Sequence, residues 1–212
     1  MKNLKYGFAS LAGMLLIVMV TGFTNCTTPS QNTDNSKSVV DPQTQNINMF
    51  VTHGHCSTPF MGRVENFNID LAKRTDQGNP LEEMRIAFEV NPNTFNVCTD
   101  EELTARIKTP GLFIGSGNQN ITFRTTEVFT MGLDWYQVNG KMSIKGVEKN
   151  VKLFVTGIRV PNENRTKSIV IHGKMDLTDW GIDYDKMVGG EPDSVPTKWM
   201  YLNMQVDISD VI

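Results

Sequence analysis

The sequence predicts an all-β domain of about eight antiparallel strands, arranged as a closed barrel or as a sandwich. From residue 46 onward, candidate strands recur about every 10 to 20 residues, with turn residues between them. Within these segments apolar and polar side chains alternate, as in strands that are buried on one face, which is typical of antiparallel sheets. No repeat of fixed period is visible, which argues against a propeller or a solenoid.

Alternation is strongest in the last segment, where Met200, Leu202 and Met204 share one face and their neighbours share the other. In the second segment, the same rule sets Val64 on the face opposite to Phe67. The expected strands are 47–52, 61–72, 81–90, 121–131, 135–147, 151–160, 168–177 and 199–208.

Two local signals break the strand pattern. The Asn139-Gly140 pair inside 135–147 predicts a tight turn, because both residues tolerate a positive φ. One short helix is expected after Thr99, which can cap it, with Glu102 three residues later completing a capping box. Glu102 can then pair with Arg106 one turn further on, and a Pro-Gly pair at 110–111 ends the helix.

The N-terminus is typical of a targeting segment. Lys2 and Lys5 precede a mostly apolar, uncharged run at 8–23, too short for an ordinary spanning helix, which needs about 20 residues. Cys26 follows directly, where a bacterial lipoprotein carries its lipid-bearing cysteine. We therefore expect a lipoprotein-type signal peptide at 1–25, lipidation at Cys26 and a flexible polar tether at 26–45. An ordinary signal peptide or an uncleaved anchor is the alternative.

Cysteine content agrees with export. If Cys26 is acylated, Cys56 and Cys98 remain as a pair. In an oxidising compartment they could form a disulfide worth about 4 kcal/mol in the chain-entropy model. Two free, partly buried thiols are the alternative. The expected location is the periplasmic side of a bacterial envelope, with the chain held by its lipid at the outer membrane.

Several function classes are disfavoured. The formal net charge of −3 argues against a nucleic-acid partner, which usually needs a basic face. No phosphate-binding loop, dinucleotide fingerprint, zinc-protease motif or G-x-S-x-G appears. His53, His55 and Cys56 are too few for a strong metal hypothesis, and the acids at Asp176, Asp179, Asp183 and Asp185 lack calcium-loop spacing. We expect no metal and no enzymatic cofactor.

Residues 138–147 read V-N-G-K-M-S-I-K-G-V, and residues 151–157 read V-K-L-F-V-T-G. They resemble the V-x-G-x-L-x-[IL]-x-G-V and V-x-L-x-V-x-G segments of the YceI-like family, with Met142 at the Leu position. Residues 60–67 resemble its first strand, residues 103–123 its helix and following strand, and residues 179–182 its [DS]-[FW]-G-I turn. Asn118-Gln119-Asn120 departs from the family's usual proline-bearing segment. The resemblance covers 46–208 and defines an expected domain at 46–212.

The resemblance implies an eight-stranded antiparallel lipocalin-like barrel with one short helix. It also implies non-catalytic binding of a long apolar lipid, such as a polyisoprenoid or an isoprenoid quinone, within the barrel. Burial at about 0.8 kcal/mol per CH₂ could hold such a chain without a polar anchor. We expect the lipid to contact Phe67, Ile86, Phe88, Phe123, Leu153, Val155, Ile171, Met175, Met200, Leu202 and Met204, with Phe113 and Trp180 at the ends.

Two other functions stay open at this point. The runner-up is a structural or partner-binding envelope lipoprotein whose barrel is filled by its own side chains, and an enzyme ranks third. The expected partners are the apolar lipid and the membrane, reached through the anchor. A homodimer is left open.

Overall fold

The computed structural model describes residues 45–53, 56–71, 81–97, 100–117, 119–163, 165–183 and 198–208, all within the unit Ser38–Ile212. Side chains are described from Pro59 onward. The expectations for the signal peptide 1–25 and for Cys26 fall outside the described residues, as does all but the last residue of the tether 26–45. The expected Cys56–Cys98 pair also falls outside them, because Cys98 and the side chain of Cys56 are not described.

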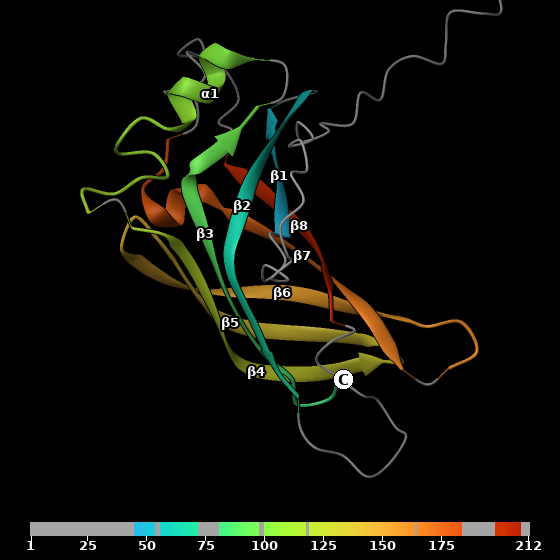
Figure 1. Ribbon diagram of the computed structural model, residues 1–212. Helices are drawn as coiled ribbons and strands as arrows, with labels where there is room; N and C mark the ends of the chain where they lie inside the picture. Colours follow the sequence, from blue (N-terminus) through green and yellow to red (C-terminus); the bar gives the residue numbers. More distant parts are fainter. Residues whose placement is uncertain are drawn as a thin grey trace, which may run out of the picture. The chain divides into compact units, whose positions relative to one another are not determined.

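Eight strands form a closed antiparallel barrel in sequence order (Figure 1). β1 pairs with both β2 and β8, which closes the sheet. This confirms the predicted fold class, and the structure selects the barrel over the sandwich. The elements are β1 (Gln45–His53), β2 (Cys56–Asp70), β3 (Arg85–Asn96), α1 (Glu101–Ile107), β4 (Ile121–Gly132), β5 (Trp135–Ile144), β6 (Val147–Arg159), β7 (Thr166–Asp176), η1 (Leu177–Trp180) and β8 (Trp199–Asp207).

The turn expected at Asn139-Gly140 is wrong. Both residues lie inside β5, paired with β4 and β6, and the chain reverses at Lys145-Gly146 instead. Lys145 and Gly146 have φ values of 57° and 79°, as a two-residue hairpin loop requires. Gly140 has another role: a Cβ there would lie 2.4 Å from the Phe123 ring and 2.5 Å from the backbone oxygen of Arg124. It leaves room for an aromatic ring on the neighbouring strand.

The helix begins one residue later than expected. Asp100, not Thr99, is the N-cap of α1, and its carboxylate accepts a hydrogen bond from the backbone N–H of Leu103 at 2.8 Å. A carboxylate at this position also favours the positive end of the helix dipole, which a threonine hydroxyl does not. The expected pairing of Glu102 with Arg106 is present.

Register shifts in β2 and β4 change which residues face inward. In β2 the register with β3 shifts between Val64 and Asn66, so Val64 is buried on the same face as Phe67, contrary to the simple alternation. In β4 the register with β5 shifts between Thr125 and Glu127 and again between Thr130 and Gly132. An extra residue in one strand reverses the facing of every residue beyond it.

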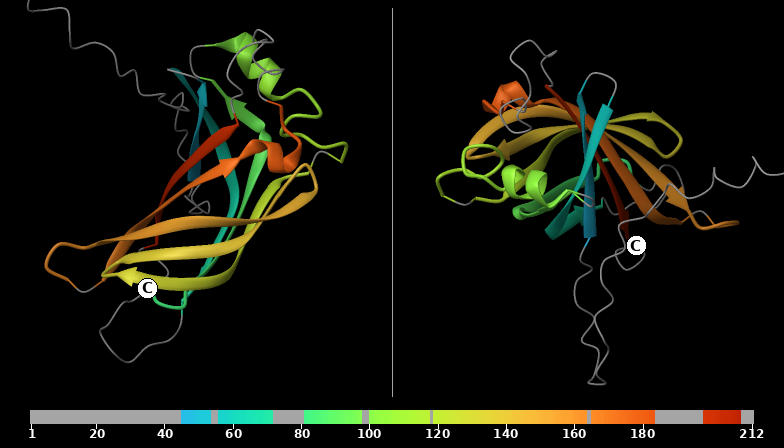
Figure 2. Two further views of the ribbon diagram at one scale, coloured as in Figure 1. Left: turned by 180° about the vertical axis from the view of Figure 1, so that it is seen from behind. Right: turned by 90° about the horizontal axis from the view of Figure 1, so that it is seen from above.

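The two ends of the barrel differ (Figure 2). One end, which we call the helix end, carries α1, η1 and the β5–β6 turn. The opposite end, which we call the hairpin end, carries the β4–β5 and β6–β7 connections. Because neighbouring strands are antiparallel, β1 runs toward the helix end and β8 toward the hairpin end, and β1 begins opposite Val64 in the middle of β2. No helix among the described residues is long and apolar enough to cross a membrane.

Candidate functional site

The interior of the barrel is a continuous apolar surface built by strand alternation. Every second residue of β8, from Met200 to Val206, is buried, and the residues between them are exposed. The strand pairings join these positions into rows: Phe67, Phe88, Phe123 and Met142 lie side by side across β2 to β5. The Phe88 and Phe123 rings stack with their centroids 5.1 Å apart.

A second interior row crosses β6, β7 and β8. Val155 pairs with Ile171, and Ile171 pairs with Met204. One step along the strands, Leu153 pairs with Gly173 and Gly173 with Leu202. The two rows together line the barrel wall with aliphatic, aromatic and methionine side chains.

The structure places the residues expected to contact the lipid as follows. Phe67 is partly buried and packs against the core. The others are buried in the core: Ile86, Phe88, Phe113, Phe123, Leu153, Val155, Ile171, Met175, Trp180, Met200, Leu202 and Met204. Their contact with a ligand stays a prediction.

The residues expected to contact the lipid do not include the inner face of β5. Tyr136, Val138, Met142 and Ile144 are all buried, in strict alternation with half-buried or exposed neighbours. The alternation is visible in the sequence, but the turn expected at Asn139-Gly140 divides it into two short pieces. Gly140 continues the face, and the Phe123 ring occupies the space that a side chain there would take.

At the helix end, aromatic side chains fill the barrel. Phe60 of β2, Phe95 of β3 and Phe113, from the segment after α1, pack together with ring centroids 5.2 to 5.7 Å apart. Edge-to-face contacts of this kind stabilise beyond the area they bury. Leu177 and Trp180 of η1 are buried at the same end. Side chains therefore pack the interior at this end.

A cleft of about 520 Å³ opens at the hairpin end, between β3 and β4. These strands pair only from Ala87–Val90 with Ile121–Arg124 and then separate. The cleft has an apolar part that belongs to the core or packs against it, and a charged rim. Its apolar residues are Leu71, Met84 and Val128, and its charged residues are Asp70, Glu83, Arg85 and Glu127.

Thr125 provides hydrogen-bond partners for the backbone of Ile86 where β3 and β4 separate. Its hydroxyl accepts a hydrogen bond from the Ile86 backbone N–H at 2.9 Å and donates one to the Ile86 backbone oxygen at 3.0 Å. A side chain thus replaces a backbone partner just where the ladder between β3 and β4 stops, and backbone groups in a protein interior require such partners. The cleft is a feature of the fold and not a frayed edge.

An ion pair holds the β4–β5 turn to the end of β6. Arg159 donates to both carboxylate oxygens of Asp134, at 2.6 and 2.9 Å, and this hydrogen bonding raises the pKa of Arg159. Beside it, burial and then the Asp134 carboxylate raise the pKa of Tyr136 to about 12. The Tyr136 phenol is therefore neutral at physiological pH, in keeping with its position on the apolar inner face.

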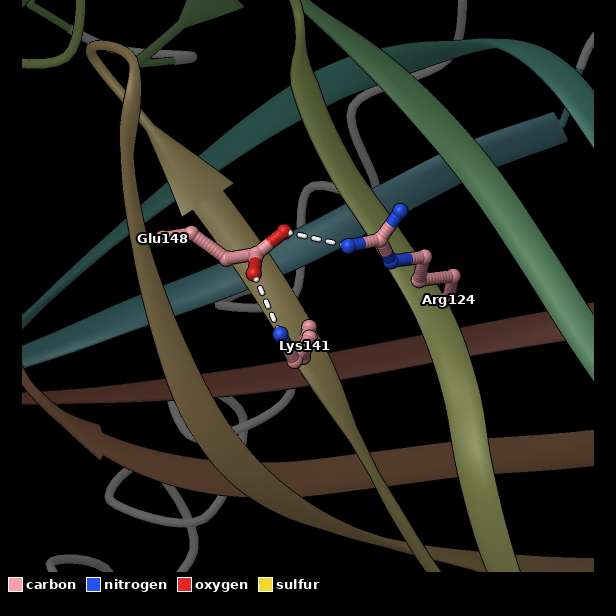
Figure 3. A network of polar contacts seen from close by, with 3 residues as sticks. All are labelled: Arg124, Lys141 and Glu148. Carbon is pink, nitrogen blue, oxygen red and sulfur yellow. Dashed lines mark hydrogen bonds and ion pairs between the residues drawn. The ribbon is translucent and has the colours of Figure 1, made fainter.

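The outer wall is polar on the same strands. Figure 3 shows Glu148 of β6 between Arg124 of β4 and Lys141 of β5, with contacts of 2.8 Å to each. The hydrogen bond from Lys141 lowers the pKa of Glu148, and the charge of Arg124 acts in the same direction. Arg124 and Lys141 lie directly opposite each other, so Glu148 offsets a repulsion between like charges.

The alternative ligand sites receive no support from the described residues. Within them, no three histidine, cysteine, aspartate or glutamate side chains gather in a way that could hold a metal ion. The side chains of His53, His55 and Cys56 lie outside the described residues, as does Asp185. Asp176 caps η1, accepts from the hydroxyl and the backbone N–H of Thr178, and pairs with Lys198 at 3.0 Å. Burial opposes ionisation of Asp176, but the Thr178 hydroxyl and Lys198 outweigh it and lower its pKa.

Comparisons with known proteins agree with this architecture. Residues 39–209 match the model of the YceI-like domain family. The crystal structure of BcnA from Burkholderia cenocepacia superposes with a TM-score of 0.58 at 13% identity, covering 78% of this chain and 96% of that one. The YCEI protein of Campylobacter jejuni gives a TM-score of 0.46 at 11% identity, covering 89% and 96% of the two chains. No curated protein matches by sequence.

The family match spans every described strand and both ends of the barrel. It also covers the four sequence motifs that indicated the resemblance. The likeness to BcnA independently supports the lipocalin-like fold. The chain is therefore a member of the YceI-like family.

Proposed function

We propose that this protein binds a long apolar lipid chain, a polyisoprenoid or an isoprenoid quinone, inside its barrel, without catalysing a reaction. The observation that carries the proposal is a continuous apolar interior that reaches a cleft at the hairpin end. The apolar residues of this cleft belong to the core or pack against it. A pocket of this volume lies in the range that small apolar ligands occupy.

Flexible side chains support the same proposal. Met142, Met175, Met200 and Met204 all lie on the inner wall, and Met84 lies beside the cleft. Methionine has three rotatable bonds and a polarisable sulfur, so it can repack around a chain of variable shape. Each methylene removed from water would contribute about 0.8 kcal/mol, so several isoprene units would bind tightly by burial alone.

The first experiment is extraction of the exported protein with organic solvent, followed by mass spectrometry of the extract and native mass spectrometry of the protein. We expect a stoichiometric isoprenoid or other long-chain lipid. A protein that is empty and that also refuses added polyprenyl chains would refute the proposal.

A pair of adjacent variants tests where the chain enters. Val128 faces the cleft and is half-buried, whereas Phe129, the next residue, points to the outer face. Val128→Trp should obstruct the cleft and weaken polyprenyl binding about tenfold or more. Phe129→Trp should leave binding unchanged. Equal affinities in the two variants would show that the lipid does not use this cleft.

One observation favours a second function. In this alternative the protein's own side chains fill the barrel, and the outer wall binds a protein partner. The Phe123 ring lies over Gly140, and a Cβ on Gly173 would lie 2.4 Å from Leu153 Cδ2, so parts of the interior are already occupied. Failure of the extraction and binding experiments would favour this function.

We also propose that the chain is anchored in the bacterial envelope through lipidated Cys26. The support is the apolar run at 8–23 followed by that cysteine. Cells given a labelled fatty acid should incorporate label into the wild-type protein and not into the Cys26→Ser variant. Equal labelling of both proteins would exclude this anchor.

A further inference from the structure

The phenol of Tyr136 is a buried polar group without a hydrogen-bond partner in the part of the chain that the structure describes. Its side chain is 0% exposed, and its oxygen forms no hydrogen bond with any described residue. Buried polar groups in proteins are almost always hydrogen-bonded, because an unmade bond leaves the loss of hydration uncompensated. A phenylalanine would fill the same space without this cost. The hydroxyl therefore points to a partner that the described chain does not supply.

Tyr136 belongs to a row of interior side chains that are expected to contact the lipid. Across β5 to β8 it pairs with Val155, Val155 pairs with Ile171, and Ile171 pairs with Met204. All four side chains are buried, and the phenol carries the only side-chain oxygen or nitrogen among them. An apolar chain that follows this row would pass directly beside the Tyr136 hydroxyl.

The phenol also lies next to the cleft between β3 and β4. Two positions along the inner face of β5 is Val138, which pairs with Val128 in the wall of the cleft. The backbone N–H of Leu81 lies near the phenol oxygen, three residues before Met84, which lines the same cleft. A ligand that enters the barrel through the cleft therefore meets the phenol at the hairpin end.

The phenol keeps its proton and is available as a hydrogen-bond donor. Burial, and then the Asp134 carboxylate, raise the pKa of Tyr136 to about 12. The Leu81 backbone N–H is itself a donor, so it cannot accept the phenol hydrogen. Both carboxylate oxygens of Asp134 already accept hydrogen bonds from Arg159. Among the described residues, the phenol hydrogen thus has no acceptor.

The same surroundings disfavour a negatively charged partner. Burial and the carboxylates of Asp134 and Glu82 oppose negative charge on the phenol, and they outweigh Arg159, which favours it. A phosphate held beside the phenol would meet the same burial and the same carboxylates. A neutral carbonyl or hydroxyl oxygen would accept from the phenol without this penalty.

We propose that Tyr136 donates a hydrogen bond to a neutral, oxygen-bearing head group of the apolar ligand, either a quinone carbonyl or a free prenol hydroxyl. The head group then lies inside the barrel at the hairpin end, and the apolar chain extends along the interior rows toward the helix end. This inference rests on the proposed lipid binding and adds the chemistry and the position of the head group.

Three isoprenoids of equal carbon number test the proposal: squalene, which has no oxygen, hexaprenol and hexaprenyl phosphate. The equilibrium binding of each radiolabelled compound to the delipidated full chain is measured in detergent. Tyr136→Phe removes only the phenol oxygen, so hexaprenol should bind about five- to tenfold more weakly, whereas squalene binding should not change. Tyr201→Phe removes the same group from an exposed ring on β8 and should change neither affinity. An equal effect of Tyr136→Phe on both ligands would overturn the proposal.

Two comparisons test the charge and the position of the head group. The wild type should bind hexaprenyl phosphate at least about tenfold more weakly than hexaprenol, and equal or tighter binding would overturn the proposal. Trp180 is a second buried donor whose Nε1 has no partner among the described residues, but it lies in η1 at the helix end. Trp180→Phe should affect hexaprenol and squalene alike. A loss confined to hexaprenol would place the head group at the helix end and overturn the proposal.

The stability of the ligand-free protein is a further readout. Because the phenol has no partner among the described residues, delipidated Tyr136→Phe should unfold at the same urea concentration as the wild type or at a higher one. A lower midpoint would show that the phenol has a partner within the chain and would overturn the proposal. If hexaprenol and squalene each bind Tyr136→Phe as tightly as the wild type, only the head-group site is refuted. If none of the three isoprenoids binds, the proposed function is refuted as well.

Discussion

Substituting Gly140 with alanine is the sharpest test of how the interior is packed. An alanine Cβ would lie 2.4 Å from the Phe123 ring and 2.5 Å from the Arg124 backbone oxygen. The ring stacks on Phe88, and the oxygen belongs to the β4 strand paired with β5, so neither can move without disturbing the barrel. Overpacking of this kind costs about 1–3 kcal/mol, against about 0.5–1 kcal/mol gained by replacing a strand glycine. We expect a net destabilisation of about 1 kcal/mol.

Two other glycines provide a graded control. At Gly132 a Cβ meets nothing within 4 Å, so Gly132→Ala should be neutral or stabilising by less than about 1 kcal/mol. At Gly173 a Cβ would lie 2.4 Å from Leu153 Cδ2, the end of a flexible side chain. Gly173→Ala should therefore cost less than Gly140→Ala.

Urea unfolding of the domain from Ser38 onward measures the series. With a slope of about 2 kcal/mol per molar, Gly140→Ala should lower the midpoint by about 0.5 M at unchanged slope. The order of stability should be Gly132→Ala, then Gly173→Ala, then Gly140→Ala. A Gly140→Ala protein as stable as the wild type would refute the packing argument, and so would equal losses in all three variants.

Two further predictions concern ionisation and the cysteines. Because the raised pKa of Tyr136 keeps its phenol neutral in the folded state, the protein should lose about 2–3 kcal/mol of stability as pH rises from about 10 to 12. Denaturation at several alkaline pH values measures this loss. The loss should vanish in Tyr136→Phe and persist in Tyr201→Phe, whose ring is exposed. Equal pH profiles of the two variants would contradict the prediction. If Cys56 and Cys98 form a disulfide, exported protein should resist alkylation until it is reduced, and reduction should cost about 4 kcal/mol of stability; rapid alkylation without a reductant would contradict it.

Local residue patterns sufficed to predict the class of fold. One-sided alternation identified eight strands near their observed positions, and in β8 it assigned every inward residue from Met200 to Val206 correctly. The inner face could be predicted there because β8 has no bulge in its pairing with β1 or β7. The family resemblance added the closed, lipocalin-like arrangement, which alternation by itself left undecided between a barrel and a sandwich.

Contacts between strands decided the rest. Asn139-Gly140 has the composition of a hairpin turn, but both residues lie within a strand. Gly140 lacks a side chain there because the Phe123 ring and the backbone of β4 occupy the space that a Cβ would need. Similarly, a single extra residue between Thr125 and Glu127 reverses the facing of the end of β4, and no local signal marks it.

The sequence by itself determined which residues alternate, where the strands run and which family they form, because these depend on neighbours along the chain. Only the tertiary structure decided the register between strands, the cleft that opens where β3 and β4 part, and the exposure of Phe129. The physical reason is that each of these depends on hydrogen bonds and packing between residues far apart in sequence, which local alternation does not encode.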